Sequence, residues 1–180
     1  MKKAAIPRRA WARVRLFAMD VDGVLTDGTV CVSSDGTESK RFAIIDGLGL
    51  LLVLRQGVDV AWISGRQSEA TSLRAAELKI PHLIQGRHDK LEALTALAAR
   101  LGIALADCAY MGDDFIDAPA IAAAGIGISV PTGLPEAIAC ADYVTRRPAG
   151  LGAVREVCDL LLASRGRGAG NPGARRRTKA

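Results

Sequence analysis

The chain has 180 residues, 49% of them hydrophobic, which is enough for one compact domain with a substantial core and too few for two. Its net charge of +5 comes from residues 1–15 and 165–180, which each carry six Lys or Arg and no acid. Residues 16–164 carry 12 basic and 19 acidic residues, which disfavours a nucleic-acid-binding fold. No apolar run is long enough to span a membrane. We expect a soluble, cytoplasmic protein with a basic N-terminal arm (1–13), one folded domain (14–164) and a disordered basic tail (165–180).

Short apolar runs alternate with amphipathic stretches along the body. Strands are predicted at Val14–Met19, Val58–Ile63, Ala109–Met111, Gly127–Val130 and Tyr143–Val144, and helices at Leu48–Arg55, Gln67–Leu78, Lys90–Leu101, Ile116–Ala124, Pro135–Ala139 and Ala153–Ala163. Such alternation is typical of the α/β class, here a Rossmann-like, doubly wound parallel sheet with helices on both faces. Ligands of these sheets bind beyond the carboxyl ends of the strands.

One interval, residues 28–42, breaks this alternation. Two segments of alternating polarity, Thr29–Ser33 and Glu38–Phe42, flank the turn Ser34-Asp35-Gly36. This pattern predicts a β-hairpin in which glycine supplies the positive φ of the turn. The hairpin follows the first strand, so we expect it to project as a flap near the carboxyl end of that strand.

Two aspartates, Asp20 and Asp22, end the first predicted strand. Residues two apart at a strand end point to the same side. Held about 4 Å apart, two carboxylates repel by about 4 kcal/mol at an effective dielectric of 20. A fold tolerates this where a cation lies between them or where one keeps its proton, and either condition is typical of a functional site. The alternative is an aspartate-rich turn after the strand.

A second acidic cluster, Asp113, Asp114 and Asp117, follows the predicted strand Ala109–Met111. Acids in a first helical turn also stabilise the helix dipole, so simple capping is the alternative interpretation. Capping does not explain why both acidic clusters lie at carboxyl ends of strands in one sheet. Together they predict a site for a hard cation such as Mg²⁺.

Two further residues complete the predicted constellation. Ser64 ends the strand Val58–Ile63, so its hydroxyl and nearby backbone amides can hold phosphate oxygens. Lys90 begins a helix, where its charge can offset a nucleophile and a transferring group. Taken singly, Ser64 would be an ordinary turn residue and Lys90 a surface lysine.

The order Asp-x-Asp-Gly, Ser-Gly-Arg, Lys and Gly-Asp-Asp-x-x-Asp resembles the four signatures of the haloacid dehalogenase-like phosphohydrolases. The resemblance implies that Asp20 attacks phosphorus and that Asp22 acts as acid and then base. It implies that Asp20, the backbone carbonyl of Asp22 and Asp113 hold Mg²⁺, supported by Asp114 and Asp117. Ser64 and Lys90 would bind the phosphoryl group.

No cap domain fits in the intervals between these motifs. A capless domain with a flap is similar to the family of 3-deoxy-D-manno-octulosonate 8-phosphate phosphatases, as are the stretches Ala141–Arg146 and Gly152–Leu162. That resemblance implies a role in lipopolysaccharide precursor biosynthesis and a homotetramer in which the flap contributes to the neighbour's site. It also implies that the sugar acid is contacted by residues from several parts of the chain: Asp22, Ala43, Ile44, Ile45, Asp46, Gly47, Arg66, Arg74 and Lys90.

Two alternatives stay open at this point. Ile45, Leu51 and Leu151 stand where some family members carry basic residues, so a nine-carbon ulosonate 9-phosphate or another sugar phosphate is the competing substrate. A non-catalytic scaffold that binds nucleic acid through its basic arms is the competing class. The intact acids and Lys90 favour the enzyme.

Overall fold

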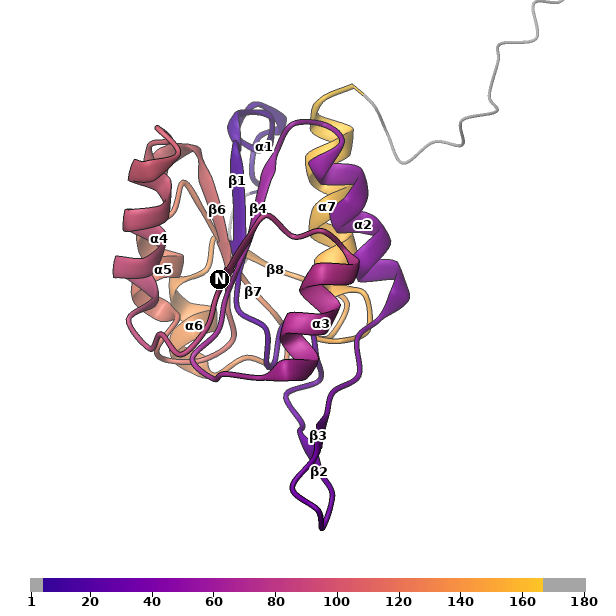
Figure 1. The fold of residues 1–180 in the computed structure, drawn as a ribbon. Coiled ribbons are helices and arrows are strands. Elements are labelled where there is room, and N and C mark those ends of the chain that lie inside the picture. The colour runs from indigo at the N-terminus through magenta and orange to yellow at the C-terminus, as the bar shows by residue number, and fades with distance from the viewer. Residues whose placement is uncertain (1–4, 167–180) are drawn as a thin grey trace, which may run out of the picture.

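The computed structural model describes residues 5–166, which build a sheet between two layers of helices, with a hairpin projecting from one end (Figure 1). The sheet has six strands in the order β5-β4-β1-β6-β7-β8, and all neighbouring pairs are parallel. The strands are β1 (Leu16–Met19), β4 (Asp59–Ile63), β5 (His82–Ile84), β6 (Cys108–Met111), β7 (Ile126–Ser129) and β8 (Tyr143–Val144). The predicted doubly wound parallel sheet is confirmed.

The central strand β1 shows why this sheet is buried on both faces. All four of its residues are buried, and they alternate between two hydrophobic cores. Phe17 and Met19 belong to one core, whereas Leu16 and Ala18 belong to the other. A strand that is apolar on both faces requires helices above and below, as in other parallel sheets.

The helices divide into two layers accordingly (Figure 1). Helices α1 (Arg8–Arg13), α2 (Ile44–Leu54), α3 (Glu69–Glu77) and α7 (Ala153–Ser164) contribute buried residues to the first core. Helices α4 (Lys90–Arg100), α5 (Ala118–Ala123) and α6 (Pro135–Cys140) contribute to the second. A short 3₁₀ helix, Leu105–Asp107, precedes β6. Helix α2 begins four positions before the predicted start at Leu48. Within residues 5–166, no helix is long and apolar enough to cross a membrane.

Part of the expected N-terminal arm is folded in the structure. Residues 1–13 were expected to form an arm, but Arg8–Arg13 fold as α1, and its Trp11 is only 4% exposed. The ring of Trp11 meets that of Tyr143 edge to face, with 5.8 Å between centroids. The apolar surface of one tryptophan therefore ties part of the arm to the body. Of the predicted disordered tail, residues 167–180 lie outside the described residues.

The predicted hairpin is present as the flap. Strands β2 (Cys31–Val32) and β3 (Glu38–Ser39) pair in antiparallel fashion. Gly36 has a φ of 85°, and Thr37 accepts a hydrogen bond from the backbone N–H of Ser33 at 2.9 Å. The hairpin extends from the carboxyl end of the sheet, as expected from its place after β1 (Figure 1).

Candidate active site

Asp20 and Lys90 meet in the buried centre of the site. Asp20 follows β1, and its backbone N–H donates to the carbonyl of Met111 on β6 at 2.9 Å. Lys90, the first residue of α4, places Nζ 2.9 Å from Asp20 Oδ1 and donates to the carbonyl of Ile63 at 2.7 Å. The exposed fractions are 6% for Asp20 and 1% for Lys90. A carboxylate and an ammonium group buried together in this way stabilise one another's charge.

Asp113 and Asp117 bring the second acidic cluster to the same place. Carboxylate oxygens of Asp20, Asp113 and Asp117 all lie within 4.8 Å of one another. The oxygens of Asp117 are already engaged: Oδ1 accepts from the hydroxyl of Tyr110 at 2.7 Å, and Oδ2 accepts from the backbone N–H groups of Asp113 and Asp114 at 3.2 Å. Asp113 Oδ1 is buried and accepts no hydrogen bond among the described residues. Asp117 therefore supports the cluster, while Asp113 keeps a free ligand atom.

The protonation of these acids shows the effect of crowding. Burial, reinforced by repulsion from Asp117, raises the pKa of Asp20 from 3.8 to about 7, although Lys90 acts in the opposite direction. Burial raises the pKa of Asp113 to about 8, and the carboxylates of Asp20, Asp117 and Asp114 add to this effect. Carboxylates in such a position stay ionised together only when a further cation joins them. Oxygen ligands and an unpartnered buried carboxylate oxygen fit Mg²⁺.

Gly23 makes the approach of the two clusters possible. It adopts a φ of +86°, and a Cβ at this position would lie 2.1 Å from Asp113 Oδ2. Gly112 has a similar place on the other side, where a Cβ would lie 2.3 Å from Cβ of Asp117. Both positions require the space that glycine leaves, and Gly23 also requires its conformational freedom. The glycines of the Asp-Gly and Gly-Asp motifs are thus part of the site.

Asp22 faces the flap and is paired with Lys40. Lys40 Nζ lies 2.7 Å from Asp22 Oδ1 and donates a hydrogen bond to Asp22 Oδ2 at 2.9 Å. The Asp22 side chain is 19% exposed, whereas that of Lys40 is 0% exposed. The structure therefore gives the predicted acid–base residue a buried cation as its partner.

Ser64 and Arg66 occupy the loop after β4. Ser64 is 1% exposed, and its hydroxyl accepts a hydrogen bond from the backbone N–H of Arg66 at 3.2 Å. The Arg66 guanidinium donates to Glu38 of the flap at 2.7 Å, and the other oxygen of Glu38 accepts from the hydroxyl of Ser68 at 2.6 Å. The bond from Ser68 is the largest of several contacts that lower the pKa of Glu38. The flap and the loop are therefore joined by a carboxylate.

Further predicted substrate contacts lie in two places, at the start of α2 and at Arg74 on α3. Arg74 lies beside this segment: a Cβ on Gly47 would lie 2.7 Å from its Nη2, and its Nε is buried without a hydrogen-bond partner among the described residues. The backbone of Ala43 precedes the helix, and the side chain of Ile44 is 81% exposed, that of Ile45 41%.

Asp46, a predicted substrate contact, makes backbone contacts that the sequence did not predict. Its carboxylate is 1% exposed and accepts hydrogen bonds from the backbone N–H groups of Gly152 at 3.3 Å and Arg155 at 2.7 Å. Burial raises its pKa, against the effect of these bonds. The structure thus shows Asp46 as the cap of α7, because its oxygens satisfy N–H groups that have no partner within that helix.

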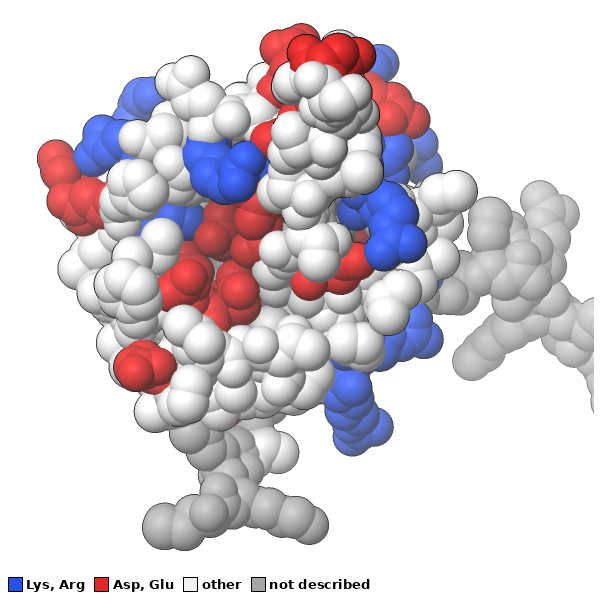
Figure 2. Space-filling view, turned by 90° about the horizontal axis from the view of Figure 1, so that it is seen from below, with Lys and Arg blue, Asp and Glu red and all other residues white. Residues whose placement is uncertain are grey.

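A view onto the flap end shows the result of these placements. Acidic side chains gather in a hollow beside the projecting hairpin, with basic side chains around it (Figure 2). Asp20, Asp22, Asp113, Asp117, Ser64 and Lys90 all follow or adjoin the carboxyl ends of β1, β4 and β6. The sequence prediction of a single site at this edge agrees with the geometry.

Sequence reasoning missed Lys40, Glu38, Thr71 and Tyr110. The alternating pattern of the hairpin offered one signal, because residues 38 and 40 are two apart on a strand and point to the same side. Their partners lie on other elements: Asp22 after β1, and Ser68 and Thr71 at the start of α3. Tyr110 belongs to an apolar strand and shows no polar signal of its own.

Comparison with known proteins gives consistent relatives. The family model of the haloacid dehalogenase-like hydrolases matches residues 64–157. The 3-deoxy-D-manno-octulosonate 8-phosphate phosphatase KdsC of Escherichia coli (strain K12) is 45% identical over 154 residues, which make up 86% of this chain and 82% of the relative. The same phosphatase from Moraxella catarrhalis, solved in complex with a magnesium ion, a phosphate ion and a KDO molecule, is 48% identical with a TM-score of 0.87, covering 88% of this chain and 91% of that one. A cobalt-bound form from Haemophilus influenzae is 34% identical with a TM-score of 0.84, covering 87% and 92%.

The fold, the paired acidic clusters and these matches define the class. The chain belongs to the haloacid dehalogenase-like hydrolases. Within that class, identity and coverage place it in the family of the 3-deoxy-D-manno-octulosonate 8-phosphate phosphatases.

Proposed function

We propose that this chain is a Mg²⁺-dependent phosphatase that converts 3-deoxy-D-manno-octulosonate 8-phosphate to the free sugar acid and phosphate, a step toward lipopolysaccharide precursors. The observation that carries the proposal is the convergence of Asp20, Asp113 and Lys90 at one buried point. The family resemblance of the whole body, including the Moraxella relative described with magnesium, phosphate and KDO, supports the substrate.

The chemistry follows from the positions of the side chains. Asp20 attacks phosphorus, so that a bond forms from its carboxylate oxygen while the ester bond to the sugar oxygen breaks. Asp22 gives a proton to that leaving oxygen and then takes one from the water that hydrolyses the phospho-aspartate. Lys90 and the loop after Ser64 hold the phosphoryl oxygens and offset their charge. When bound by Asp20, the backbone carbonyl of Asp22 and Asp113, Mg²⁺ supplies further positive charge for the same purpose.

The sugar acid has basic partners on the flap side of the crevice. Arg74 keeps a buried Nε without a partner among the described residues, beside the backbone of the segment that ends at Gly47. The side chain of Arg66 is half exposed and forms an ion pair with Glu38 of the flap. Guanidinium groups suit a carboxylate because they offer paired, planar donors. We assign recognition of the sugar carboxylate to these two arginines.

A phosphate-release assay over three substrates tests the proposal. 3-Deoxy-D-manno-octulosonate 8-phosphate is compared with a nine-carbon ulosonate 9-phosphate and with ribose 5-phosphate, each with Mg²⁺ and with EDTA. We expect kcat/KM for the eight-carbon substrate to exceed the others by at least about tenfold, since the partnerless Nε of Arg74 penalises substrates without a matching carboxylate, even though its Nη1 already pairs with Glu77. Preference for the nine-carbon acid would support the competing substrate, and equal rates on all three would overturn the assignment to sugar acids.

We further propose a cytoplasmic homotetramer in which each flap covers a neighbour's site. Large apolar side chains are exposed around the flap and the start of α2: Val32 66%, Ile44 81%, Leu48 47% and Leu151 66%. Clustered apolar exposure of this kind is typical of interfaces. Light scattering after size exclusion should give four times the monomer mass, and Ile44→Asp should reduce it. A monomer at micromolar concentration would contradict the assembly, and cell fractionation tests the location.

The scaffold alternative has its own test. A protein that binds nucleic acid through basic arms should retain an RNA oligonucleotide on a filter in a salt-dependent way. We expect weak retention that disappears when residues 167–180 are deleted. Retention that survives the deletion, together with no phosphate release, would favour the scaffold.

A further inference from the structure

Lys40 makes an unusual set of contacts for a residue on a projecting hairpin. Its side chain is 0% exposed, and Nζ touches both carboxylate oxygens of Asp22, at 2.7 and 2.9 Å. Nζ also donates to Thr71 Oγ1 at 3.3 Å and lies 3.8 Å from Glu38 Oε1. An ammonium group has three hydrogens, and here they face acceptors from the end of β1, the flap and α3.

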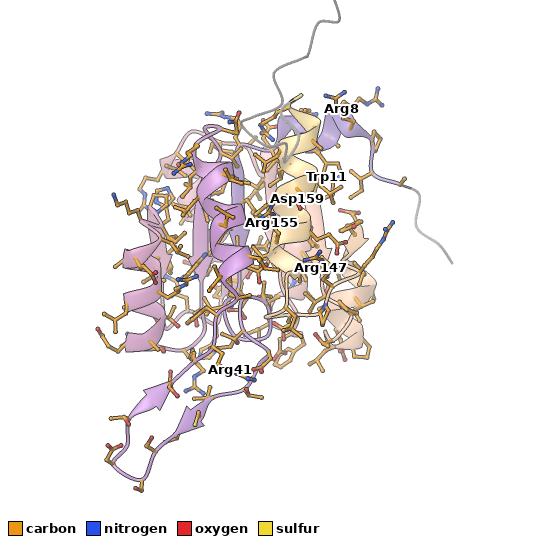
Figure 3. All side chains as sticks on the ribbon, turned by 90° about the vertical axis from the view of Figure 1, so that its right-hand side faces the viewer. Arg8, Trp11, Arg41, Arg147, Arg155 and Asp159 are labelled. Atoms are coloured by element: carbon orange, nitrogen blue, oxygen red, sulfur yellow. The ribbon has the colours of Figure 1, made fainter. Side chains whose placement is uncertain are left out.

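Arg41, the next residue along the flap, forms an exposed ion pair with which the buried Lys40 can be compared. Arg41 pairs with Asp27 at 2.7 Å, but its side chain is 87% exposed (Figure 3). An exposed pair of this kind is screened by water and holds the hairpin at little cost in desolvation. Burying an ammonium group is unfavourable unless its acceptors are placed to receive it. The burial of Lys40 therefore serves the acid that it contacts more than the attachment of the hairpin.

We propose that Lys40 is a positioning residue of the phosphatase, which holds the Asp22 carboxylate in the orientation required for proton transfer. The inference rests on the proposed function, from which it takes the role of Asp22. Nζ lies 2.7 Å from Oδ1 and 2.9 Å from Oδ2, so the ammonium group fixes the direction of the carboxylate through both of its oxygens. Each carboxylate oxygen has a second lone pair, which stays available to the leaving oxygen or the attacking water. The flap contributes to the chemical step through this lysine.

The test uses Lys40→Met in the full chain with Mg²⁺, assayed on two kinds of ester. The leaving group of the sugar-acid phosphate is an alkoxide, which needs a proton from Asp22. The leaving group of p-nitrophenyl phosphate is a stable phenolate, which does not. kcat/KM reports formation of the phospho-aspartate in both cases. We expect kcat/KM to fall about 100-fold on the sugar-acid phosphate and by less than about threefold on the aryl ester. Equal losses on the two esters would overturn the proposal.

A double-mutant cycle shows whether Lys40 acts through Asp22. Asp22→Asn should by itself produce the same selective loss on the sugar-acid phosphate. Adding Lys40→Met to that variant should change kcat/KM by less than about twofold, because the positioned carboxylate is already missing. Losses that multiply would show that Lys40 acts independently, on the substrate or on the fold, and would overturn the inference.

Controls separate this inference from the proposed function and from misfolding. Lys79→Met makes the same change at an exposed position at the end of α3 and should leave both kcat/KM values within about twofold of the parent. If Lys40→Met does not fold, as judged by circular dichroism and thermal unfolding, Thr71→Val removes one acceptor of the lysine, and we expect an about tenfold loss on the sugar-acid phosphate alone. Failure of Asp22→Asn to reduce turnover would overturn the role of Asp22 itself. Loss in Asp22→Asn with full activity in Lys40→Met would overturn only the role of the lysine.

Discussion

The two ends of the parallel sheet handle charge in opposite ways. At the amino end, arginines bind backbone carbonyls: Arg8 donates to the carbonyl of Ser164 at 3.1 Å, and Arg165 donates to those of Trp11, Val14 and Leu161. At the carboxyl end, Asp20, Asp113 and Asp117 crowd around Lys90. Figure 3 shows Arg8 and Trp11 far from Arg41 at the base of the flap.

The difference separates what stabilises this chain from what gives it chemistry. At the amino end Arg8 and Arg165 meet uncharged backbone carbonyls, and Arg13 pairs with the carboxylate of Asp107 at 2.8 Å, so each of these cations has an acceptor and no carboxylates are crowded together. At the carboxyl end burial raises the pKa values of Asp20 and Asp113 to about 7 and about 8. Repulsion between neighbouring carboxylates adds to this effect, since there are too few cations to offset it. Such unfavourable charge is retained where a ligand relieves it. Four changes test this contrast.

The largest effect is expected for Asp20→Asn at the carboxyl end. Loss of the nucleophile should lower kcat on the sugar-acid phosphate by at least about 10⁴-fold. The metal-free variant should unfold at the same temperature as the parent or a higher one, since one crowded carboxylate has gone and Asp117, 3.4 Å from Nζ, still neutralises Lys90. Phosphate release and thermal unfolding measure the two results. Comparable turnover would remove the assignment of the nucleophile, and a large loss of stability would weaken the contrast between the ends.

Trp11→Ala tests the amino end. Trp11 is buried against Tyr143, so its removal should lower the free energy of unfolding by about 3–5 kcal/mol. kcat/KM of the folded fraction should stay within about twofold of the parent. Urea denaturation and phosphate release at low temperature give the two quantities. A strong loss of kcat/KM in the folded fraction would show that the two ends are coupled.

The metal should change the pH dependence of stability. The folded metal-free protein holds protons on Asp20 and Asp113 up to about pH 7 and 8, whereas the unfolded chain releases them near 3.8. Stability contributed by these protonated acids is present below pH 3.8 and is lost as the pH rises through 7 and 8. Mg²⁺ takes the place of the protons, so about 100 Kd of Mg²⁺ should stabilise the protein by about 2.7 kcal/mol near pH 8 and by much less near pH 5.5. Thermal unfolding with Mg²⁺ and with EDTA at both values checks this. An equal shift at both would contradict the metal site.

The smallest effect is expected for Asp46→Asn, in the first turn of α2. As a cap of α7, Asp46 should contribute about 1 kcal/mol to the free energy of unfolding. KM for the sugar-acid phosphate should change little, because the carboxylate is occupied by backbone N–H groups. Urea denaturation and steady-state kinetics distinguish the roles. A tenfold rise in KM with unchanged stability would instead support the sequence prediction that Asp46 contacts the substrate.

The meeting of the site residues at the carboxyl end of the sheet could be predicted from the sequence, because it follows from the general geometry of parallel sheets. Asp20, Ser64 and Asp113 each follow an apolar strand, and parallel strands present these ends at one edge. Asp46 is different, since Gly152, the N-cap of the helix that it caps, lies 106 positions further along the chain and only packing brings the two together. Lys40 was missed for the same reason: its partners depend on how the hairpin folds back over β1 and α3.

Gly23 is a position at which a related sequence could lose the site without losing any of its acids. Its missing Cβ leaves the volume that Asp113 Oδ2 occupies, 2.1 Å from where a methyl group would stand. A descendant of this chain that gained any side chain there would keep every acid in its alignment and yet push two of them apart. A sequence survey that checks only the aspartates and the lysine would predict that such a descendant is active. A survey that also checks this glycine would predict that it is inactive.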